Sequence, residues 1–435
     1  MKKKFTIGVI ALLLLFLATF WGVRGWQYSM LWTAQEALQK QEYGKVRLLT
    51  QRLLFYPVNA EIKQRSAYLL AKAYLGDPNL ASDKALGQAI LLLETIPPSS
   101  PDYLDALVVR ARQLFLVEYK ACASERLLKQ VLDRDPKYRE ANELLFSIYC
   151  ATNRAEHADG PFWTAFAQVD AAQKPDLFRL WFLSQFTRNL ANRQIDVAFG
   201  IVAPNQAPSD DDVLNRFIFL KNREPDQALH YGTMASWWLW KTETKVAFEV
   251  LEAGQKASKT ISEEVYLSIL IQALVNQGEF GKAAQFIKQW PEKDRGFNYW
   301  RLLGIVQQAN DQYELAVSSF KKCAQVWPGP IDANVGFRTA QCLKELGRNE
   351  EAAVVEGRTT KIRFWMEDSW ASVRGALDFM NDKRAVAKLI EFFEGIGRPE
   401  AIDYLKQHLS QLPAGTSVSA ESGDVRFIVE TDGDL

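Results

Sequence analysis

Apolar residues recur every three or four positions over most of the chain, from about residue 30 to residue 410. Val246, Val250 and Leu251 are one such set. This is the period of a helix with one buried face, and no stretch before the last twenty residues alternates like a strand. Prolines fall mostly between the apolar runs, where the missing N–H and the restricted preceding residue end helices. The pattern predicts an all-α chain of hairpins with helices of about 12–16 residues.

Residues 297–330 carry the clearest repeat. The segment reads Trp300-x2-Leu303-Gly304, then Ala316-x3-Phe320, then Pro328. This spacing closely resembles the tetratricopeptide (TPR) repeat, with Gln307 standing where the TPR pattern has tyrosine. In that pattern small residues let two antiparallel helices approach closely, and bulky residues fill the space between them. The resemblance implies a hairpin of two packed helices.

Weaker copies of the repeat flank this segment at 228–261, around the turn 276–280 and downstream of 333. Successive copies are offset by 36, 33 and 36 residues, so a TPR-like array covers 228–365. The first half of the body is more degenerate, and Sel1-like or other helical-repeat registers are alternatives there. We predict one TPR-like α-solenoid with a degenerate region at 30–210, a TPR-like region at 211–410 and a bend near 204–212.

The beginning of the chain pairs a basic start with a long apolar run. Three lysines at 2–4 precede an apolar stretch over residues 5–23. As a helix these 19 residues reach about 28 Å, close to the ~30 Å hydrocarbon core of a bilayer. A cleaved signal peptide is the alternative, although residues 20–24 make a poor cleavage site. We predict an uncleaved transmembrane helix over 5–23, with Trp21 and Trp26 as interfacial residues.

Basic residues are more numerous before the apolar run than just after it. The positive-inside rule then places residues 1–4 in the cytoplasm and the body from residue 27 onward outside it. A Met-Lys-Lys-Lys start followed by leucine-rich sequence is typical of bacteria. We expect a single-pass protein of the bacterial inner membrane with a periplasmic or otherwise extracytoplasmic body.

Charge and residue types argue against several classes of function. Lys+Arg and Asp+Glu number 52 each, so no net positive charge attracts nucleic acid. The sequence has no phosphate-binding glycine motif and no catalytic cluster. Its three histidines, His157, His230 and His408, are far apart and suit packing or surface roles better than metal ligation. We predict no catalytic residue, no metal, no cofactor and no nucleic-acid partner.

The TPR resemblance also implies a concave groove lined by the first helices of successive repeats. In this sequence the groove positions fall on Trp237, Trp240, Gln272, Asn276, Asn298, Arg301, Gln308, Asn334, Gln341 and Lys344. Amides and cations suit the backbone of an extended peptide, whereas Trp237 and Trp240 suit an apolar anchor or a sugar ring. A plain solvated face is the alternative interpretation.

Four cysteines fall on neighbouring helices of the predicted stack. Cys323 and Cys342 form one candidate disulfide pair, and Cys122 and Cys150 form another. The alternative role is that of small apolar residues at close helix crossings.

Residues 411–435 form a polar and acidic tail with one strand-like run at 424–430. A disordered tail and a peptide that adds a strand to a partner's sheet are its two interpretations.

Repeat arrays expose long curved surfaces that suit binding better than catalysis. We therefore expect a membrane-anchored, extracytoplasmic TPR scaffold or assembly factor that binds other proteins of an envelope complex and is not an enzyme. The alternative is a glycan- or substrate-binding component of a polysaccharide or secretion pathway that uses an aromatic groove.

Overall fold

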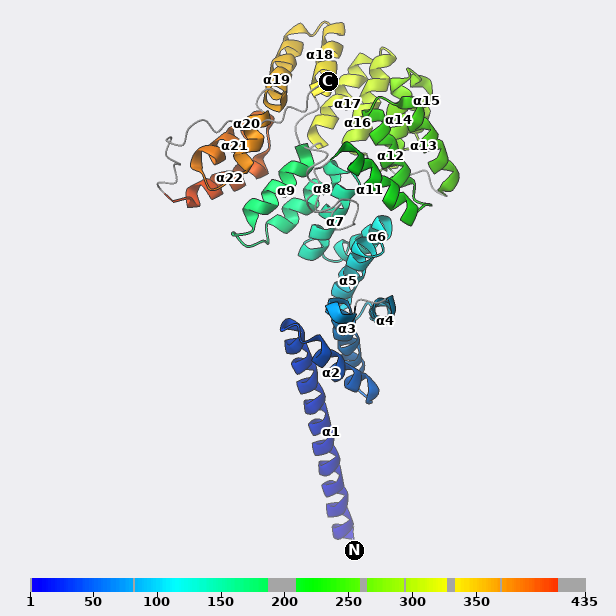
Figure 1. Ribbon diagram of the computed structural model, residues 1–435, viewed down its shortest axis with the longest axis vertical. Coiled ribbons are helices and arrows are strands. Elements are labelled where there is room, and N and C mark those ends of the chain that lie inside the picture. Colours follow the sequence, from blue (N-terminus) through cyan, green and yellow to red (C-terminus); the bar gives the residue numbers. More distant parts are fainter. Residues whose placement is uncertain are drawn as a thin grey trace. The chain divides into compact units, whose positions relative to one another are not determined.

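The computed structural model describes residues 2–80, 83–186, 209–258, 264–292, 295–326, 333–367 and 370–413. The side chains of residues 2–20, 83, 210 and 370 lie outside this description. Every regular element within these ranges is a helix (Figure 1). The all-α helical-repeat prediction is therefore confirmed. The predicted bend near 204–212 and the tail at 411–435 fall largely outside the described residues.

The chain divides into two compact units, Met1–Ile148 and Tyr149–Leu435. The boundary between the units falls inside α7. The predicted change from degenerate to regular repeats at 210/211 stays a prediction. The first unit contains α1 (Lys2–Gln39), α2 (Tyr43–Phe55), α3 (Ala60–Gly76), the short 3₁₀ turn η1 (Pro78–Leu80), α4 (Asp83–Glu94), α5 (Tyr103–Leu116), α6 (Ala121–Leu132) and most of α7 (Arg139–Ala151). The last turn of α7 belongs to the second unit.

The second unit holds the remaining described helices. They are α8 (Ala155–Phe166), α9 (Lys174–Phe186), α11 (Asp210–Arg223), α12 (Ala228–Trp240), α13 (Thr244–Ala257), α14 (Glu264–Asn276), α15 (Phe280–Ile287), α16 (Phe297–Ala309), α17 (Tyr313–Val326), α18 (Ala333–Glu345), α19 (Asn349–Glu367), α20 (Trp370–Leu377), α21 (Lys383–Ile396) and α22 (Pro399–Gln411).

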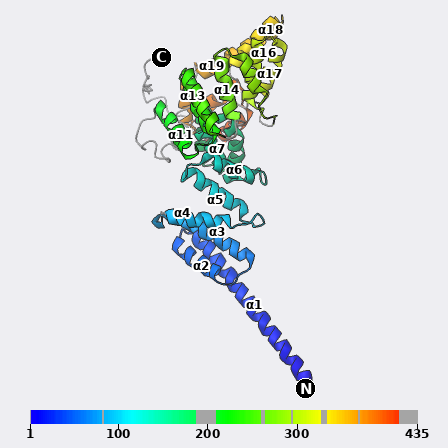
Figure 2. The same ribbon diagram turned by 90° about the vertical axis from the view of Figure 1, so that its right-hand side faces the viewer.

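In the first unit, α1 runs without interruption from the basic start into the first hairpin (Figure 2). Its far end, Met30–Ala37, joins Val46 and Leu53 of α2 in one apolar core. The predicted membrane helix and the start of the body are thus parts of one helix. Among the described residues, no helix is both long and apolar enough to cross a membrane. The predicted span over 5–23 falls mainly on residues 2–20, whose side chains lie outside the description, and it stays a prediction.

Four successive hairpins of the second unit match the four predicted repeats (Figure 1): α12/α13, α14/α15, α16/α17 and α18/α19. The first helices contact one another in order along the array. Within the third hairpin the helices approach so closely that a Cβ on Gly304 would lie 2.5 Å from a ring carbon of Phe320. The small residue of the repeat pattern therefore makes room for the aromatic one, and the hairpins are TPR-like.

The turns of these hairpins share one conformation. Each has one residue with positive φ, namely Thr242 (62°), Gly278 (76°), Asp311 (55°) and Gly347 (72°). These positions are 36, 33 and 36 residues apart, as the sequence repeats are. The next N–H donates to a carbonyl five residues back, as from Glu243 to Trp238 at 2.8 Å. This left-handed termination caps the first helix of each hairpin.

Thr242 is the least suitable of these turn residues, because a β-branched side chain is strained at positive φ. We expect Thr242→Gly to raise the free energy of unfolding by about 0.5–1 kcal/mol, since the left-handed penalty exceeds the entropy cost of glycine. Gly278→Ala is the matched control and should lower it by about 1 kcal/mol. Chemical denaturation of both variants measures these changes, and a less stable Thr242→Gly protein would contradict the argument.

The second unit also contains contacts between segments far apart in sequence. Asp159 of α8 pairs with Arg398, at the start of α22, across 239 positions. Trp181 of α9 stacks on Phe393 of α21, with ring centroids 5.9 Å apart. Near the start of α8, Asn298 of α16 donates to Glu156 at 3.3 Å. The repeats of this unit are therefore not a stack of nearest-neighbour contacts alone.

Candidate functional site

The first helices of three successive repeats, with Phe280 at the start of α15, line a groove of about 610 Å³ in the second unit. Six of the ten predicted groove residues lie in it, from α14, α16 and α18: Gln272, Asn276, Arg301, Gln308, Asn334 and Gln341. They come together because residues at i, i+3, i+4 and i+7 share one face of a helix. The sequence repeat thus places equivalent polar side chains side by side.

Hydrogen bonds hold several of these side chains in position. Arg338 of α18 donates from Nη1 to Oε1 of Gln308 at 2.8 Å, and the Nε2 of Gln308 donates to Oε1 of Gln341 at 3.1 Å. On α14, Gln272 donates to Asn276 at 2.7 Å. The α16–α18 part of the groove is therefore an ordered row of amides and a guanidinium.

The groove combines this polar row with an apolar part and a positive charge. Val275, Phe280, Ile305 and Val335 contribute apolar surface. Among the described residues that line the groove, two are arginines, Arg301 and Arg338, and none is acidic. Guanidinium groups bind carboxylates in bidentate geometry, and amides can both donate to and accept from a peptide backbone. The chemistry of the groove suits an extended segment with acidic side chains.

Sequence reasoning missed Arg338 and the apolar lining. Arg338 lies four residues after Asn334 and three before Gln341, so the helical spacing alone assigns it to the same face. The positions taken from the TPR resemblance did not include it.

Three of the other predicted residues lie elsewhere. Asn298 faces α8 and donates to Glu156, and Lys344 pairs with Glu356 of α19. Trp240 ends α12 with 43% of its surface exposed, and the ammonium of Lys241 lies 4.5 Å from its ring centroid. None of the three lines the groove.

Trp237, the other indole predicted to contact a ligand, is buried in the structure. Its side chain is only 3% exposed and packs with Val213 and Phe217 of α11. Its ring lies 4.9 Å from that of Trp240, so one partly exposed ring remains where the sequence suggested a pair. The physical reason is that the apolar face of α12 is covered by α11, a packing that repeat positions do not reveal.

All four cysteines are buried, and none takes part in a disulfide in the structure. Cys323 and Cys342 belong to one apolar core, whereas Cys122 and Cys150 lie in different units. Burial raises the pKa of Cys342, and it raises the pKa of Cys150 to about 12. A buried thiol with a raised pKa is a packing group and a poor nucleophile. Pairing under oxidising conditions stays a prediction.

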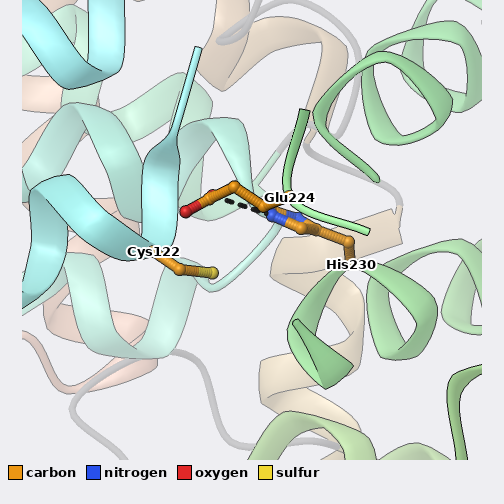
Figure 3. A group of neighbouring side chains, drawn as sticks. All are labelled: Cys122, Glu224 and His230. Carbon is orange, nitrogen blue, oxygen red and sulfur yellow. Dashed lines mark hydrogen bonds and ion pairs between the residues drawn. The ribbon is translucent and has the colours of Figure 1, made fainter. Parts of the chain in front are cut away.

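His230 is a buried histidine of the second unit with a carboxylate partner. Its Nε2 lies 3.1 Å from Oε2 of Glu224, at the connection between α11 and α12 (Figure 3). Beside it, the hydroxyl of Tyr231 donates to the carbonyl of Pro225 at 2.9 Å. These bonds fix the start of α12. Cys122, also drawn in Figure 3, belongs to the first unit.

His157 of α8 links this helix to α14. Its Nε2 lies 3.2 Å from a carboxylate oxygen of Glu264 and 4.0 Å from one of Glu156. Burial alone lowers the pKa of His157, but the hydrogen bond to Glu264 and the two negative charges outweigh burial and the repulsion by Arg154. The pKa of His157 is therefore raised above its ordinary value.

A raised pKa in the folded state makes this contact pH-dependent. The stabilisation is fully present below the unfolded pKa of about 6.5 and is lost as the pH rises through the folded pKa. Because the imidazole is 32% exposed, we expect an effect of less than about 1 kcal/mol. Unfolding measured from pH 6 to pH 8.5 should show this loss in the natural protein and a flatter profile in Glu264→Gln. Identical pH profiles of the two proteins would contradict a stabilising contact between His157 and Glu264.

No family model and no curated protein matches this chain. Among solved structures, it is similar to a chain of the APC/C hetero-tetramer Cut9–Hcn1, with 11% identity, 88% of this chain and 87% of that chain covered, and a TM-score of 0.36. It is also similar to the TPR domain of P58(IPK), with 14% identity, coverage of 88% and 98%, and a TM-score of 0.22. At such low TM-scores, neither likeness indicates what this chain binds.

Proposed function

We propose that this protein is a membrane-anchored, extracytoplasmic scaffold that binds acidic, extended segments of other proteins in the groove formed by α14, α16 and α18. The groove is the observation that carries the proposal. It presents ordered amides, two arginines and apolar side chains on one face of three repeats. A segment lying across three helices contacts several equivalent positions, which repeat proteins use to hold partners.

The membrane part of the proposal is supported by the sequence of α1. Its apolar run over 5–23 follows three lysines, and the helix continues directly into the first hairpin. A single-pass anchor with a cytoplasmic N-terminus in a bacterial inner membrane agrees with this charge pattern. It leaves the body on the extracytoplasmic side, where the partners belong to a membrane or envelope complex.

Binding without catalysis is supported by the surroundings of the reactive groups. The thiols are buried, and His230 and His157 are engaged with carboxylates. The glycan alternative has less support, because the burial of Trp237 leaves one partly exposed indole at the end of α12. Sugar-binding surfaces rely on exposed aromatic rings.

Peptide binding tests the proposal directly. The purified full-length chain is titrated with fluorescent extended peptides in matched pairs, where each Glu or Asp of one member is replaced by Gln or Asn in the other. We expect binding of the acidic member that weakens as salt is raised, because charge attraction to Arg301 and Arg338 is screened. Equal affinity for both members of each pair would overturn the assignment of an acidic ligand.

A further inference from the structure

Several large aromatic side chains of the first unit are exposed where α1 leaves the apolar run. Trp21 is 67% exposed and Trp26 is 47% exposed. Phe55 and Tyr56, at the end of α2, are 85% and 47% exposed. The Phe55 ring is thus almost fully exposed to water, which is unfavourable for an aromatic side chain. The rings of Phe55, Tyr56 and Trp26 adjoin one another, and a contiguous exposed apolar group of this kind marks a surface that contacts something else.

Three contacts hold the connection between α2 and α3, and the start of α3, against α1 at this level. The rings of Trp26 and Tyr56 meet edge to face, with centroids 5.7 Å apart. The Nε2 of the buried Gln27 donates to the carbonyl of Pro57 at 3.3 Å. One residue further, the hydroxyl of Tyr28 donates to Glu61 at 3.3 Å. The connection is therefore fixed at the height of Trp26 along α1.

This height is close to the end of the apolar run. Trp26 is three residues beyond Val23, which is about 4.5 Å along a helix. The polar layer on each side of a bilayer is roughly 5–7 Å deep, and tryptophan and tyrosine concentrate there. If residues 5–23 lie in the hydrocarbon, Phe55 and Tyr56 meet this layer. Arg52, exposed one turn before Phe55, suits anionic headgroups.

We propose that the end of α2 and its connection to α3, through Phe55 and Tyr56, form a second membrane contact that lies in the interfacial layer of the bilayer beside α1. Phe55 enters the boundary of the acyl chains, and the Tyr56 ring, packed on Trp26, stays at headgroup level. Two points of contact fix the tilt of the first unit on the membrane, which one helix alone does not. This inference rests on the proposed anchor.

Site-specific labelling of the full-length chain tests it. The native cysteines are buried, so Phe55→Cys can be labelled with an environment-sensitive fluorophore. In vesicles of phosphatidylcholine and phosphatidylglycerol, we expect a blue shift and strong quenching by nitroxides placed shallowly in the lipid. Trp32→Cys is the matched control, because this position is also exposed (66%) but lies about 14 Å beyond Val23. Its label should keep the emission of a probe in water.

A third label separates this inference from the anchor itself. Ala18→Cys lies within the apolar run and should be quenched by deeply placed nitroxides. Quenching at position 18 together with a water-like signal at position 55 would overturn the interfacial contact and leave the anchor standing. Water-like signals at both positions would overturn both. Quenching at 18 and 55 but not at 32 is the predicted result.

Discussion

Asp159→Ala should lower the free energy of unfolding of the second unit by about 3–5 kcal/mol, because it leaves a buried arginine without its counter-charge. Oδ1 of Asp159 accepts from Nε1 of Trp181 at 3.1 Å and from Nε1 of Trp163 at 3.3 Å, and it binds the guanidinium of Arg398. Arg398 is 1% exposed, and its Nε and Nη1 have no hydrogen-bond partner among the residues that the structure describes. The carboxylate is thus the anion that this guanidinium requires. Denaturant unfolding followed by far-UV circular dichroism measures the loss.

Two controls separate charge from packing in this experiment. Replacing both partners, Asp159→Leu with Arg398→Met, removes the buried charges together and should cost much less than the single change. Glu394→Ala breaks the exposed pair with Lys406, whose side chain is 57% exposed, and should cost less than about 1 kcal/mol. If Asp159→Ala is no worse than Glu394→Ala, the pair does not join α8 to α22 in solution.

The second large effect is expected in the groove. Arg338→Glu places a negative charge where an acidic segment would bind, and it breaks the hydrogen bond to Gln308. Disrupting a charge pair at an interface costs about 2–5 kcal/mol of binding free energy, which corresponds to a Kd raised by about 30-fold or more. Titration of the variant with an acidic peptide that binds the natural chain measures the change.

Arg363→Glu is the matched control for this reversal. Arg363 is exposed on α19 and pairs with Glu367 at 2.8 Å, outside the lining of the groove. It changes the net charge by the same amount, so a general electrostatic effect would weaken binding in both variants. Circular dichroism spectra establish that both variants are folded. Equal losses of affinity in the two proteins would count against a specific role for the groove.

The helical hairpins and much of the groove could be predicted because they depend on residues that are close together in the sequence. The prolines that end helices and the repeat pattern around Gly304 and Phe320 define the hairpins. The left-handed turns recur with the same offsets as the repeats, at Thr242, Gly278, Asp311 and Gly347. Side chains at helical spacing then fall on one face. Six predicted residues consequently line a single groove.

Other features could not be predicted, because they depend on distant segments. Nothing near Asp159 indicates a partner 239 positions away, and nothing near His157 indicates Glu264. Trp237 has the residue type of a binding group, yet it is covered by α11. The division of the units within α7 likewise depends on tertiary contacts that repeat spacing does not encode.

The central claim is that α14, α16 and α18 hold an acidic segment of another protein, and photo-crosslinking in membranes tests it most directly. A photoreactive amino acid replaces Gln272 in the groove or, as control, Leu315, which is 54% exposed on α17 outside the groove. We predict adducts from position 272 that map to an acidic segment of a membrane or envelope protein, disappear with Arg338→Glu and are absent from position 315. Adducts that persist with Arg338→Glu, or that form equally from both positions, would contradict the account.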